Sequence, residues 1–390
     1  STSGLTSNSV KLTVTASDGQ SGLADSGRYT YYLNSTQKAS NNTNSYTYTG
    51  LTANTSYTLK VVVKDKAGKT TEKSTTVKTK QETVSDGITS GKPYTKNTVI
   101  YDSYNNPVKV PAGFKIASDS GTDVTKGVVI EDVSAGDSNT KGNQYVWIPI
   151  GKVKYNTSGA TKTINFGRYE FETNSAGVMK QSADNYTSVV EIDVGNSYNY
   201  TERTSGARNT IAKNLGDFIT KAKNAGGYYI GRYEAGKVDG NTDTFNIKKG
   251  QEVYTEINQL DAATLARNLY SGNNNFESDL INSYAWDTAI VYIQTFSGDT
   301  DYSLQSRFQS GITITGNAHD EENNYDVRCN IYDIAGNVRE WSTETYTDNL
   351  NPSTSRGADY ITSTSFTAHR TFNSTSYEPI DISFRSILYL

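Results

Sequence analysis

The sequence predicts a β-sandwich over residues 1–80 and, after a linker at residues 81–96, a larger α+β domain over residues 97–390. Three observations support this organisation. In the first 80 residues, apolar and polar side chains alternate over several short stretches, as they do in half-buried strands. The linker has no periodicity and is rich in Ser, Thr and Gly. Beyond it, three helix-like stretches interrupt a chain dominated by strand and turn signals, which favours an α+β class.

Composition limits the functions that the chain can have. Its 390 residues carry a formal net charge of −4, with a pI of about 5.4, so nothing favours a nucleic-acid partner. The chain has one cysteine, Cys329, which excludes a disulfide framework. Its two histidines, His319 and His369, leave little for a histidine-based metal site. No apolar run approaches the roughly 20 residues of a membrane span. The abundance of Ser, Thr, Asn, Tyr and Gly is typical of bacterial extracellular β-proteins.

The first 80 residues contain five strand-like stretches, whose positions are Val10 to Val14, Tyr29 to Leu33, Ser45 to Tyr48, Tyr57 to Val63 and Thr70 to Lys80. Leu51 precedes Tyr57 by six positions, and this spacing resembles the tyrosine corner of fibronectin type III and related immunoglobulin-like modules. The resemblance implies a spacer, with a binding surface of its own as the alternative. Because the sequence starts at Ser1 without a Met, we expect a fragment or a processed form, which a signal or anchor could precede. Because the first strand looks short, we expect the domain to begin before Ser1.

Strands and helices alternate irregularly in the larger domain. Expected strands lie at residues 99–101, 108–110, 114–117, 127–130 and 145–148. The last two of these look like a buried antiparallel pair, and we expect Trp147 in the core. Apolar residues recur with helical spacing over residues 210–225, 261–270 and 283–296. Ser283 is the candidate N-cap of the third helix, and Gly226 and Gly227 stop the first.

Residues 332–341, Tyr-Asp-Ile-Ala-Gly-Asn-Val-Arg-Glu-Trp, are the most informative stretch. Their Gly-Asn pair favours a sharp turn, because both residues tolerate a left-handed conformation, and the turn sets Glu340 and Trp341 on a following strand. The stretch resembles the D-x-x-GN-x-x-EW motif of the formylglycine-generating-enzyme-like branch of the C-type lectin fold. Further pieces agree in the family's order, namely residues 145–149, a helix at 284–296, Arg356-Gly357 and residues 382–385. The resemblance covers residues 97–390 and implies a C-type lectin fold.

The residues that carry catalysis in this family are missing. Its enzymes oxidise a substrate cysteine with copper and a pair of their own cysteines, which lie between the Arg-Gly and Phe-Arg elements. Here that interval, residues 356–385, has no cysteine, and Cys329 lies outside it. Related iron-dependent sulfoxide synthases need three histidines, and this chain has two. We therefore expect no enzyme and no cofactor, and a buried, inert thiol at Cys329. Asn337 and Glu340 carry oxygens that calcium accepts, but a hydrogen-bonded role in the fold is favoured over a metal site.

The same interval has a composition suited to recognition. It mixes aromatic residues, which supply contact area at low entropic cost, with Ser, Thr and Asn, which adapt their hydrogen bonds. It resembles the C-terminal variable region of the variable proteins of diversity-generating retroelements, which are lectin-fold ligand binders. The resemblance implies that residues 357–377, here named the recognition segment, face solvent on a scaffold that includes Arg356, Phe384 and Arg385. The predicted ligand-binding residues are Tyr360, Thr362, Phe366, His369, Thr371, Phe372, Asn373 and Tyr377. An ordinary lectin-like loop region is the alternative.

Three functions follow from these patterns. The favoured one is an extracellular ligand-binding or adhesion protein, carried by a bacterial cell surface or a phage particle, that binds a protein or a glycan. A second is the repeating subunit of an extracellular filament or pilus-like assembly, in which aromatic patches are contacts between copies. A third, an oxidase of the formylglycine-generating type, is disfavoured by the missing cysteines.

Overall fold

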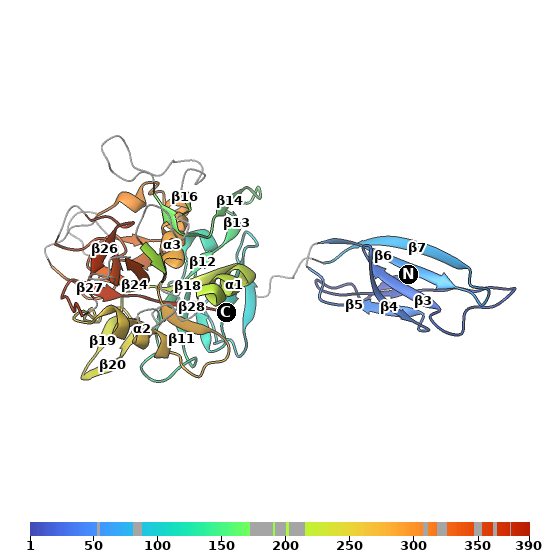
Figure 1. The fold of residues 1–390 in the computed structure, drawn as a ribbon, viewed down its shortest axis with the longest axis horizontal. Coiled ribbons are helices and arrows are strands. Elements are labelled where there is room, and N and C mark those ends of the chain that lie inside the picture. The colour runs from blue at the N-terminus through green and yellow to red at the C-terminus, as the bar shows by residue number, and fades with distance from the viewer. Residues whose placement is uncertain are drawn as a thin grey trace. The chain divides into compact units, whose positions relative to one another are not determined.

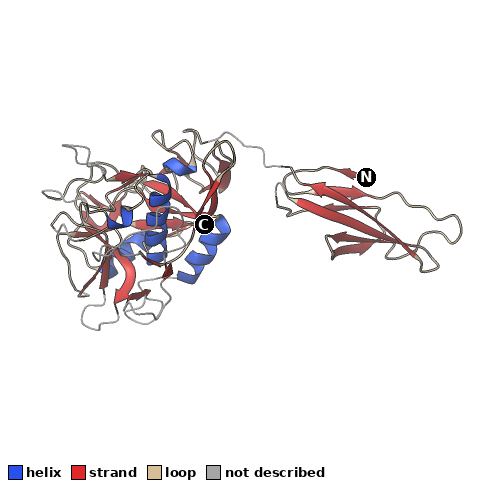
Figure 2. Cartoon of the chain, turned by 90° about the horizontal axis from the view of Figure 1, so that it is seen from above, coloured by secondary structure: helices blue, strands red, loops and turns tan. Residues whose placement is uncertain are grey.

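The computed structural model describes residues 1–52, 55–80, 88–171, 190–191, 200–202, 215–306, 311–317, 326–346, 353–361, 365–374 and 376–390. These residues are mostly β-structure, which confirms the β-rich character that the sequence predicts (Figure 1). The chain divides into two compact units, Ser1–Ser85 and Asp86–Leu390. The three α-helices among the described residues all belong to the second unit (Figure 2). Within these ranges, none of the helices has the length and apolar character that crossing a bilayer requires.

The first unit contains two antiparallel sheets that share one core. One sheet has the strand order β1-β2-β5 and the other β4-β3-β6-β7. Their strands are β1 (Thr2–Ser3), β2 (Val10–Thr13), β3 (Tyr29–Leu33), β4 (Thr36–Asn41), β5 (Ser45–Tyr48), β6 (Ser56–Lys64) and β7 (Thr70–Lys78). Val10, Tyr31 and Leu59 are buried in the shared core. The predicted alternation is confirmed for β2, β3 and β6, in which every second side chain is buried over part of the strand. In β7, which the sequence also predicts as a strand, only Val77 is buried.

Tyr57 makes the contact that its spacing from Leu51 predicts. Its hydroxyl oxygen accepts a hydrogen bond from the backbone N–H of Thr52 at 2.9 Å. A tyrosine corner uses such a bond to tie a strand to the chain a few residues upstream. Of the predicted linker, residues 81–87 lie outside the described residues. Tyr94, near the end of that linker, pairs through its backbone with Phe114 in the second unit.

A six-stranded sheet forms one half of the second unit, with the order β10-β11-β12-β18-β28-β21. Its strands are β10 (Phe114–Ile116), β11 (Val129–Asp132), β12 (Gln144–Pro149), β18 (Gly227–Gly231), β21 (Glu277–Leu280) and β28 (Ser386–Tyr389). The predicted antiparallel pair is confirmed, since Val129 of β11 lies opposite Val146 of β12. Trp147 is fully buried, as predicted. The last strand, β28, pairs with both β18 and β21, so the C-terminal end of the chain lies inside the sheet.

A five-stranded sheet carries the sequence motif and the recognition segment. Its path is β17-β24-β25-β26, and β27 pairs with β24 in parallel. Its strands are β17 (Tyr200–Glu202), β24 (Arg339–Tyr346), β25 (Ser353–Arg356), β26 (Arg370–Asn373) and β27 (Ile382–Phe384). Two-stranded ladders join β8 (Thr98–Tyr101) to β9 (Pro107–Val110), β13 (Gly151–Lys154) to β14 (Thr161–Ile164), β15 (Tyr169–Glu170) to β16 (Val190–Glu191), β19 (Gly236–Val238) to β20 (Asn241–Asn246), and β22 (Val327–Arg328) to β23 (Ile331–Tyr332).

The three predicted helices are found close to their predicted ranges. They are α1 (Leu215–Ala225), α2 (Gln259–Asn268) and α3 (Ser283–Phe296), and two short 3₁₀ turns are η1 (Val124–Lys126) and η3 (Tyr302–Leu304). Residues 210–214 of the first predicted helix lie outside the described residues. The predicted cap of α3 is wrong: Asn282, one residue earlier than Ser283, accepts a hydrogen bond from the Ala285 N–H. A carboxamide oxygen can reach this N–H from the N-cap position, whereas Ser283 is already the first residue of the helix.

Helix α3 is buried on almost every side. It contacts β12 of the six-stranded sheet and β24 of the five-stranded sheet. The sequence predicts a single apolar face, yet polar residues such as Asp287 and Gln294 are buried as well. Buried polar side chains need partners, and Asp287 is one of the two carboxylates of a buried ion network that is described below.

We predict that Gly227→Ala lowers the free energy of unfolding of the second unit by about 2 kcal/mol or more, because overpacking a filled core strains side chains and backbone. An added Cβ at this position lies 2.5 Å from the carbonyl oxygen of Ile148 and clashes with Trp147. Denaturant unfolding followed by tryptophan fluorescence reports the second unit, which contains all three Trp residues. Gly311→Ala is the control, since its Cβ meets open space. Equal stability of the two variants contradicts the packing described here.

Candidate functional site

The Gly-Asn turn of the motif is held by the side chain of Asn337. This residue has the left-handed φ of 60° that its type tolerates. Its Oδ1 accepts a hydrogen bond from the Thr313 N–H at 2.9 Å, and its Nδ2 donates to Glu234 at 2.7 Å. Its carbonyl oxygen accepts from the Tyr360 N–H at 2.9 Å. Asn337 therefore joins the motif to the first part of the recognition segment and to the chain around Thr313.

The motif glutamate is paired with the terminal arginine. Arg385 donates from Nε to both carboxylate oxygens of Glu340 at 3.0 and 3.1 Å, and from Nη2 to Oε1 at 2.6 Å. Both side chains are fully buried. This is the hydrogen-bonded role in the fold that the sequence favours for Glu340. In the part of the chain that the structure describes, no group of three or more His, Cys, Asp or Glu side chains is arranged to hold a metal ion.

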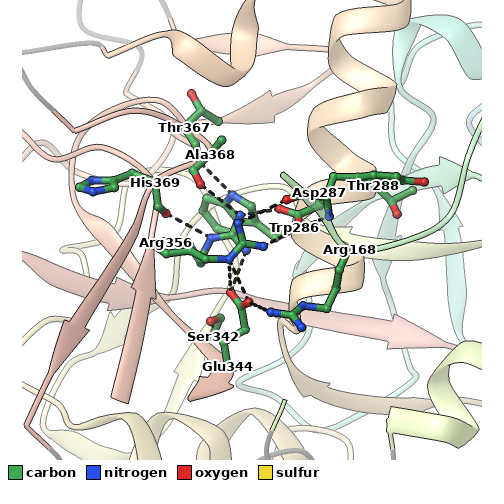
Figure 3. A network of polar contacts seen from close by, with 12 residues as sticks. Arg168, Trp286, Asp287, Thr288, Ser342, Glu344, Arg356, Thr367, Ala368 and His369 are labelled. Carbon is green, nitrogen blue, oxygen red and sulfur yellow. Dashed lines mark hydrogen bonds and ion pairs between the residues drawn. The ribbon is translucent and has the colours of Figure 1, made fainter. Parts of the chain in front are cut away.

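Figure 3 shows a second buried network beside Thr367, Ala368 and His369 of the recognition segment. Glu344 of β24 accepts from Arg356 Nη1 at 2.9 Å, from Arg168 Nη2 at 2.6 Å and from Arg370 Nε at 2.9 Å. Asp287 of α3 accepts from Arg356 Nη2 at 2.5 Å and from Arg370 Nη2 at 2.7 Å. The network thus consists of three guanidinium groups around two carboxylates. It links the helix α3 to the neighbouring strands β24, β25 and β26.

The arginines determine the ionisation of Glu344. Burial raises the pKa of its carboxyl, but the charges of Arg370, Arg356 and Arg168 outweigh burial and hold the pKa well below the ordinary 4.5. Arg370 stays charged as well: burial lowers its pKa, and Asp287 and Glu344 more than compensate for this. Arg356 also lies over the Trp286 ring at 5.6 Å from the centroid. Such desolvated cation–π contacts add to the charge pairing.

Backbone contacts fix the recognition segment at several points. The Gly357 N–H donates to the carbonyl oxygen of His369 at 3.3 Å, which closes the loop between β25 and β26. The Thr367 and Ala368 N–H groups donate to the chain at η3, at 3.0 and 3.1 Å. Trp286 Nε1 donates to the Thr367 carbonyl oxygen at 2.9 Å. The two ends of this loop are therefore held by the same region that contains the ion network.

None of the described side chains that the sequence predicts to bind ligand is buried. Phe372 and Tyr377 are 48% and 44% exposed. The half-buried ones are Tyr360, Phe366, His369, Thr371 and Asn373. Thr362 lies outside the described residues. The three scaffold residues named with them, Arg356, Phe384 and Arg385, are fully buried.

The structure places these residues in smaller groups. The rings of Phe366 and His369 lie 6.5 Å apart. On β26, alternation puts Phe372 on the sheet face that Arg370 occupies, and it puts Thr371 and Asn373 on the other face. Asn373 Nδ2 accordingly lies 3.2 Å from Ser355 Oγ. The sequence treats the predicted positions as one face, whereas the pleat of β26 divides three of them between two faces.

Exposed aliphatic residues near the segment are absent from the sequence prediction. Ile361 lies within the segment and Ile380 just after it, and both are more than half exposed. Ile312 and Ile314 flank Thr313, whose backbone is bonded to Asn337, and both are exposed. An emphasis on aromatic and hydroxyl residues misses them. The tendency of large aliphatic side chains to be buried makes their exposure the informative signal, and exposure is not readable from composition.

Cys329 and His369 remain as candidates for chemistry, and both are half-buried, so the expectation of a fully buried thiol is not met. Burial raises the pKa of the Cys329 thiol to about 12, and its Sγ lies 3.7 Å from the Thr125 carbonyl oxygen. The thiol is therefore protonated at neutral pH, as expected of an inert cysteine. Burial, together with the charges of Arg339 and Arg356, lowers the pKa of His369, so its neutral form predominates at neutral pH.

Comparisons with known proteins identify no family. No family model and no curated protein match the chain. Among solved structures, the chain is similar to variable protein 1 of Treponema denticola, with 16% identity and a TM-score of 0.25 over 64% of this chain and 96% of that one. Its similarity to CarF has 16% identity and a TM-score of 0.31 over 42% of this chain and 87% of that one. Its similarity to chitinase ChiA74 from Bacillus thuringiensis has 22% identity and a TM-score of 0.18; it covers 40% of this chain and only 17% of the chitinase. These TM-scores are too low to assign a fold or a function.

We predict that Glu344→Gln lowers the free energy of unfolding of the second unit at pH 7 by about 3 kcal/mol or more, because three buried guanidinium groups lose a counter-charge. Since the folded-state pKa of Glu344 lies below 4.5, its contribution is present above that pH and is lost as the pH falls. The stability difference between the native chain and the variant therefore shrinks below about pH 4.5. Tryptophan fluorescence during denaturant unfolding measures it at each pH.

Glu252→Gln is the matched control, because Glu252 pairs with Lys237 at the surface and its side chain is largely exposed. We expect this substitution to leave the stability of the second unit nearly unchanged. A Glu344→Gln variant as stable as this control contradicts the role given to the network.

Proposed function

We propose that the chain is a ligand-binding protein in which the recognition segment contacts a protein or glycan on another surface. In this proposal the second unit is a C-type lectin fold of the formylglycine-generating-enzyme-like branch. The first unit is a fibronectin type III or immunoglobulin-like spacer that holds it away from a bacterial cell surface or phage particle. Binding requires complementary contact and no bond-making. The proposed activity therefore does not depend on a catalytic residue.

The observation that supports the proposal most directly is the contrast between the scaffold and the segment. Arg356 is fully buried and bound to two carboxylates, whereas Phe372, two residues beyond Arg370 on the paired strand, is 48% exposed. Exposing an aromatic ring to water has a free-energy cost that burial against a partner recovers. Aromatic residues also dominate the binding energy of known interfaces. A fixed frame that carries exposed aromatic side chains suits recognition by surface contact.

The organisation of the segment also supports variation without loss of the fold. Its frame is made by buried charges on α3 and β24 and by backbone hydrogen bonds at Gly357, Thr367 and Ala368. Backbone bonds do not depend on side-chain identity. Substitutions at exposed positions such as Tyr377 therefore change the surface and leave these bonds in place. This is the property that the resemblance to retroelement variable proteins implies.

We predict that Phe372→Ser and Tyr377→Ser each weaken saturable binding of the labelled chain by about tenfold or more, as loss of an interface anchor does. The assay measures binding to a panel of intact bacterial cells, with the cells also treated by protease or by periodate. Protease sensitivity of the binding identifies a protein ligand, and periodate sensitivity identifies a glycan.

Val99→Ser is the matched control, because Val99 is an exposed apolar residue outside the recognition segment. It is expected to bind as the native chain does. If the native chain and both segment variants bind with the same affinity, the segment is not the contact surface and the proposal fails.

We also predict that sister isolates differ mainly at the predicted ligand-binding positions of the segment. Sequencing the gene from such isolates is expected to show substitutions concentrated at Tyr360, Thr362, Phe366, His369, Thr371, Phe372, Asn373 and Tyr377. Arg356, Phe384 and Arg385 are expected to be unchanged, because replacing a buried scaffold residue is costly. Substitutions spread evenly over the second unit contradict diversification. A filament subunit would instead show unchanged aromatic residues at its contacts.

A further inference from the structure

Four carboxyl groups are buried beneath the Gly-Asn turn. They belong to Glu234, Asp326, Asp333 and Glu340, and none is more than 5% exposed. The two chain segments that carry them lie side by side. The Tyr332 N–H donates to the Arg232 carbonyl oxygen at 3.0 Å, and the rings of Tyr233 and Tyr332 are 4.9 Å apart. Asp333 lies close enough to Glu234 for its charge to act on the Glu234 carboxyl.

Arg385 is the cation that binds Glu340, and each of its three nitrogens already donates a hydrogen bond. Nε and Nη2 bind Glu340, Nη1 donates to the Gly231 carbonyl oxygen at 2.8 Å, and Nη2 also donates to the Tyr332 carbonyl oxygen at 2.8 Å. Asp326 accepts hydrogen bonds from the Tyr302 hydroxyl at 2.7 Å and from the Ala335 N–H. Glu340 therefore has the guanidinium as its partner, and Asp326 has these two donors.

Glu234 and Asp333 lack such partners. Glu234 Oε2 accepts one hydrogen bond from Asn337, at 2.7 Å. Among the described residues, Glu234 Oε1 and Asp333 Oδ2 are buried and have no hydrogen-bond partner. Two ionised carboxylates side by side in a buried site repel each other, and each unpartnered oxygen adds a desolvation cost. A proton on one of the two carboxyls removes the repulsion and supplies the missing donor.

We propose that Glu234 and Asp333 hold one proton between them at neutral pH, and that this shared proton makes the second unit less stable as the pH rises. One carboxyl donates its O–H to the ionised oxygen of the other, which satisfies both unpartnered atoms. Burial, and after it the charge of Asp333, raises the pKa of Glu234 well above its ordinary 4.5. Burial and the charge of Asp326 raise the pKa of Asp333 well above 3.8.

The surrounding groups decide which way the pair titrates. The charges of Asp326 and Glu340 raise the pKa values of the pair, whereas the charge of Arg385 lowers them. Arg328 faces Tyr302 and Asp326. The nearby phenols of Tyr233 and Tyr302 have raised pKa values because they are buried, so they stay neutral. Arg232, whose guanidinium lies 5.5 Å from the centroids of the Tyr233 and Tyr332 rings, is a further cation on this side of the pair. Burial and the two carboxylates outweigh the cations, because the pKa values of both Glu234 and Asp333 are raised.

The sign of the pH effect follows from linkage. The folded pKa of the pair is raised, so the stabilisation is complete below the ordinary values of 4.5 and 3.8 and is lost as the pH rises through the folded value. At pH values between the ordinary carboxyl pKa and the raised folded-state pKa, the folded chain holds one proton that the unfolded chain does not. Unfolding then releases this proton, and the unfolding equilibrium constant rises about tenfold per pH unit. Glu234→Gln removes this proton, because its amide accepts from Asn337 at one end and donates to ionised Asp333 at the other.

The test measures denaturant unfolding of the full chain between pH 5 and 9, followed by tryptophan fluorescence, for the native chain, Glu234→Gln and the surface control Glu252→Gln. We expect the native chain and the control to lose stability relative to Glu234→Gln by about tenfold in the equilibrium constant per pH unit over the neutral range. Parallel curves for all three proteins overturn the proposal.

Asp333→Asn provides a mirror test, since its amide can donate to an ionised Glu234, and it should remove the same proton linkage. Infrared spectroscopy of the native chain needs no variant to fold. It should show the carbonyl band of a protonated carboxylic acid at pH 7. If the native chain lacks this band at pH 7, both carboxyls are ionised and the shared proton does not exist.

Discussion

The ion network of Asp287 and Glu344 with Arg168, Arg356 and Arg370 is the constraint on which the C-terminal half of the second unit depends. Five charged groups are taken out of water, and each needs an opposite charge at hydrogen-bond distance. Hydrophobic packing tolerates small shifts of one strand against another. Directional bonds between guanidinium and carboxylate groups do not, so this network selects one register for β24, β25 and β26 on α3.

In the proposed binding surface, the buried frame and the exposed side chains have different roles. The costs of ordering the chain are met within the fold, by buried charges and by backbone bonds, and a partner does not have to supply them. The exposed aromatic and aliphatic side chains are not needed for this frame, so in the proposal they serve contact with the partner. The acid pair Glu234–Asp333 is connected to the recognition segment through Asn337. The Asn337 side chain donates to Glu234, and its carbonyl oxygen accepts from the Tyr360 N–H.

The sequence predicts local secondary structure better than it predicts contacts between residues far apart in the chain. The alternation in β2 and β6, the antiparallel pair β11–β12 and the range of α3 are all recovered, because each depends on a period of a few residues. Arg356, Phe384 and Arg385 are also placed correctly as scaffold. The network is not predicted, since Arg168, Asp287 and Glu344 are far apart in the chain and each alone resembles a solvated charge. The division of Thr371 and Phe372 between two faces depends on the pleat of β26, which the segment's irregular composition conceals.

The central claim is that the frame and the surface of the recognition segment are separable, and a saturation scan of residues 356–385 tests it most directly. Each variant is displayed on yeast, and resistance to protease reports folding without any ligand. The account predicts that Phe372 and Tyr377 accept most polar replacements without loss of resistance, while Arg356 and Arg385 accept almost none. If the exposed aromatic positions prove as intolerant as Arg356, the segment belongs to the core of the fold and the account is wrong.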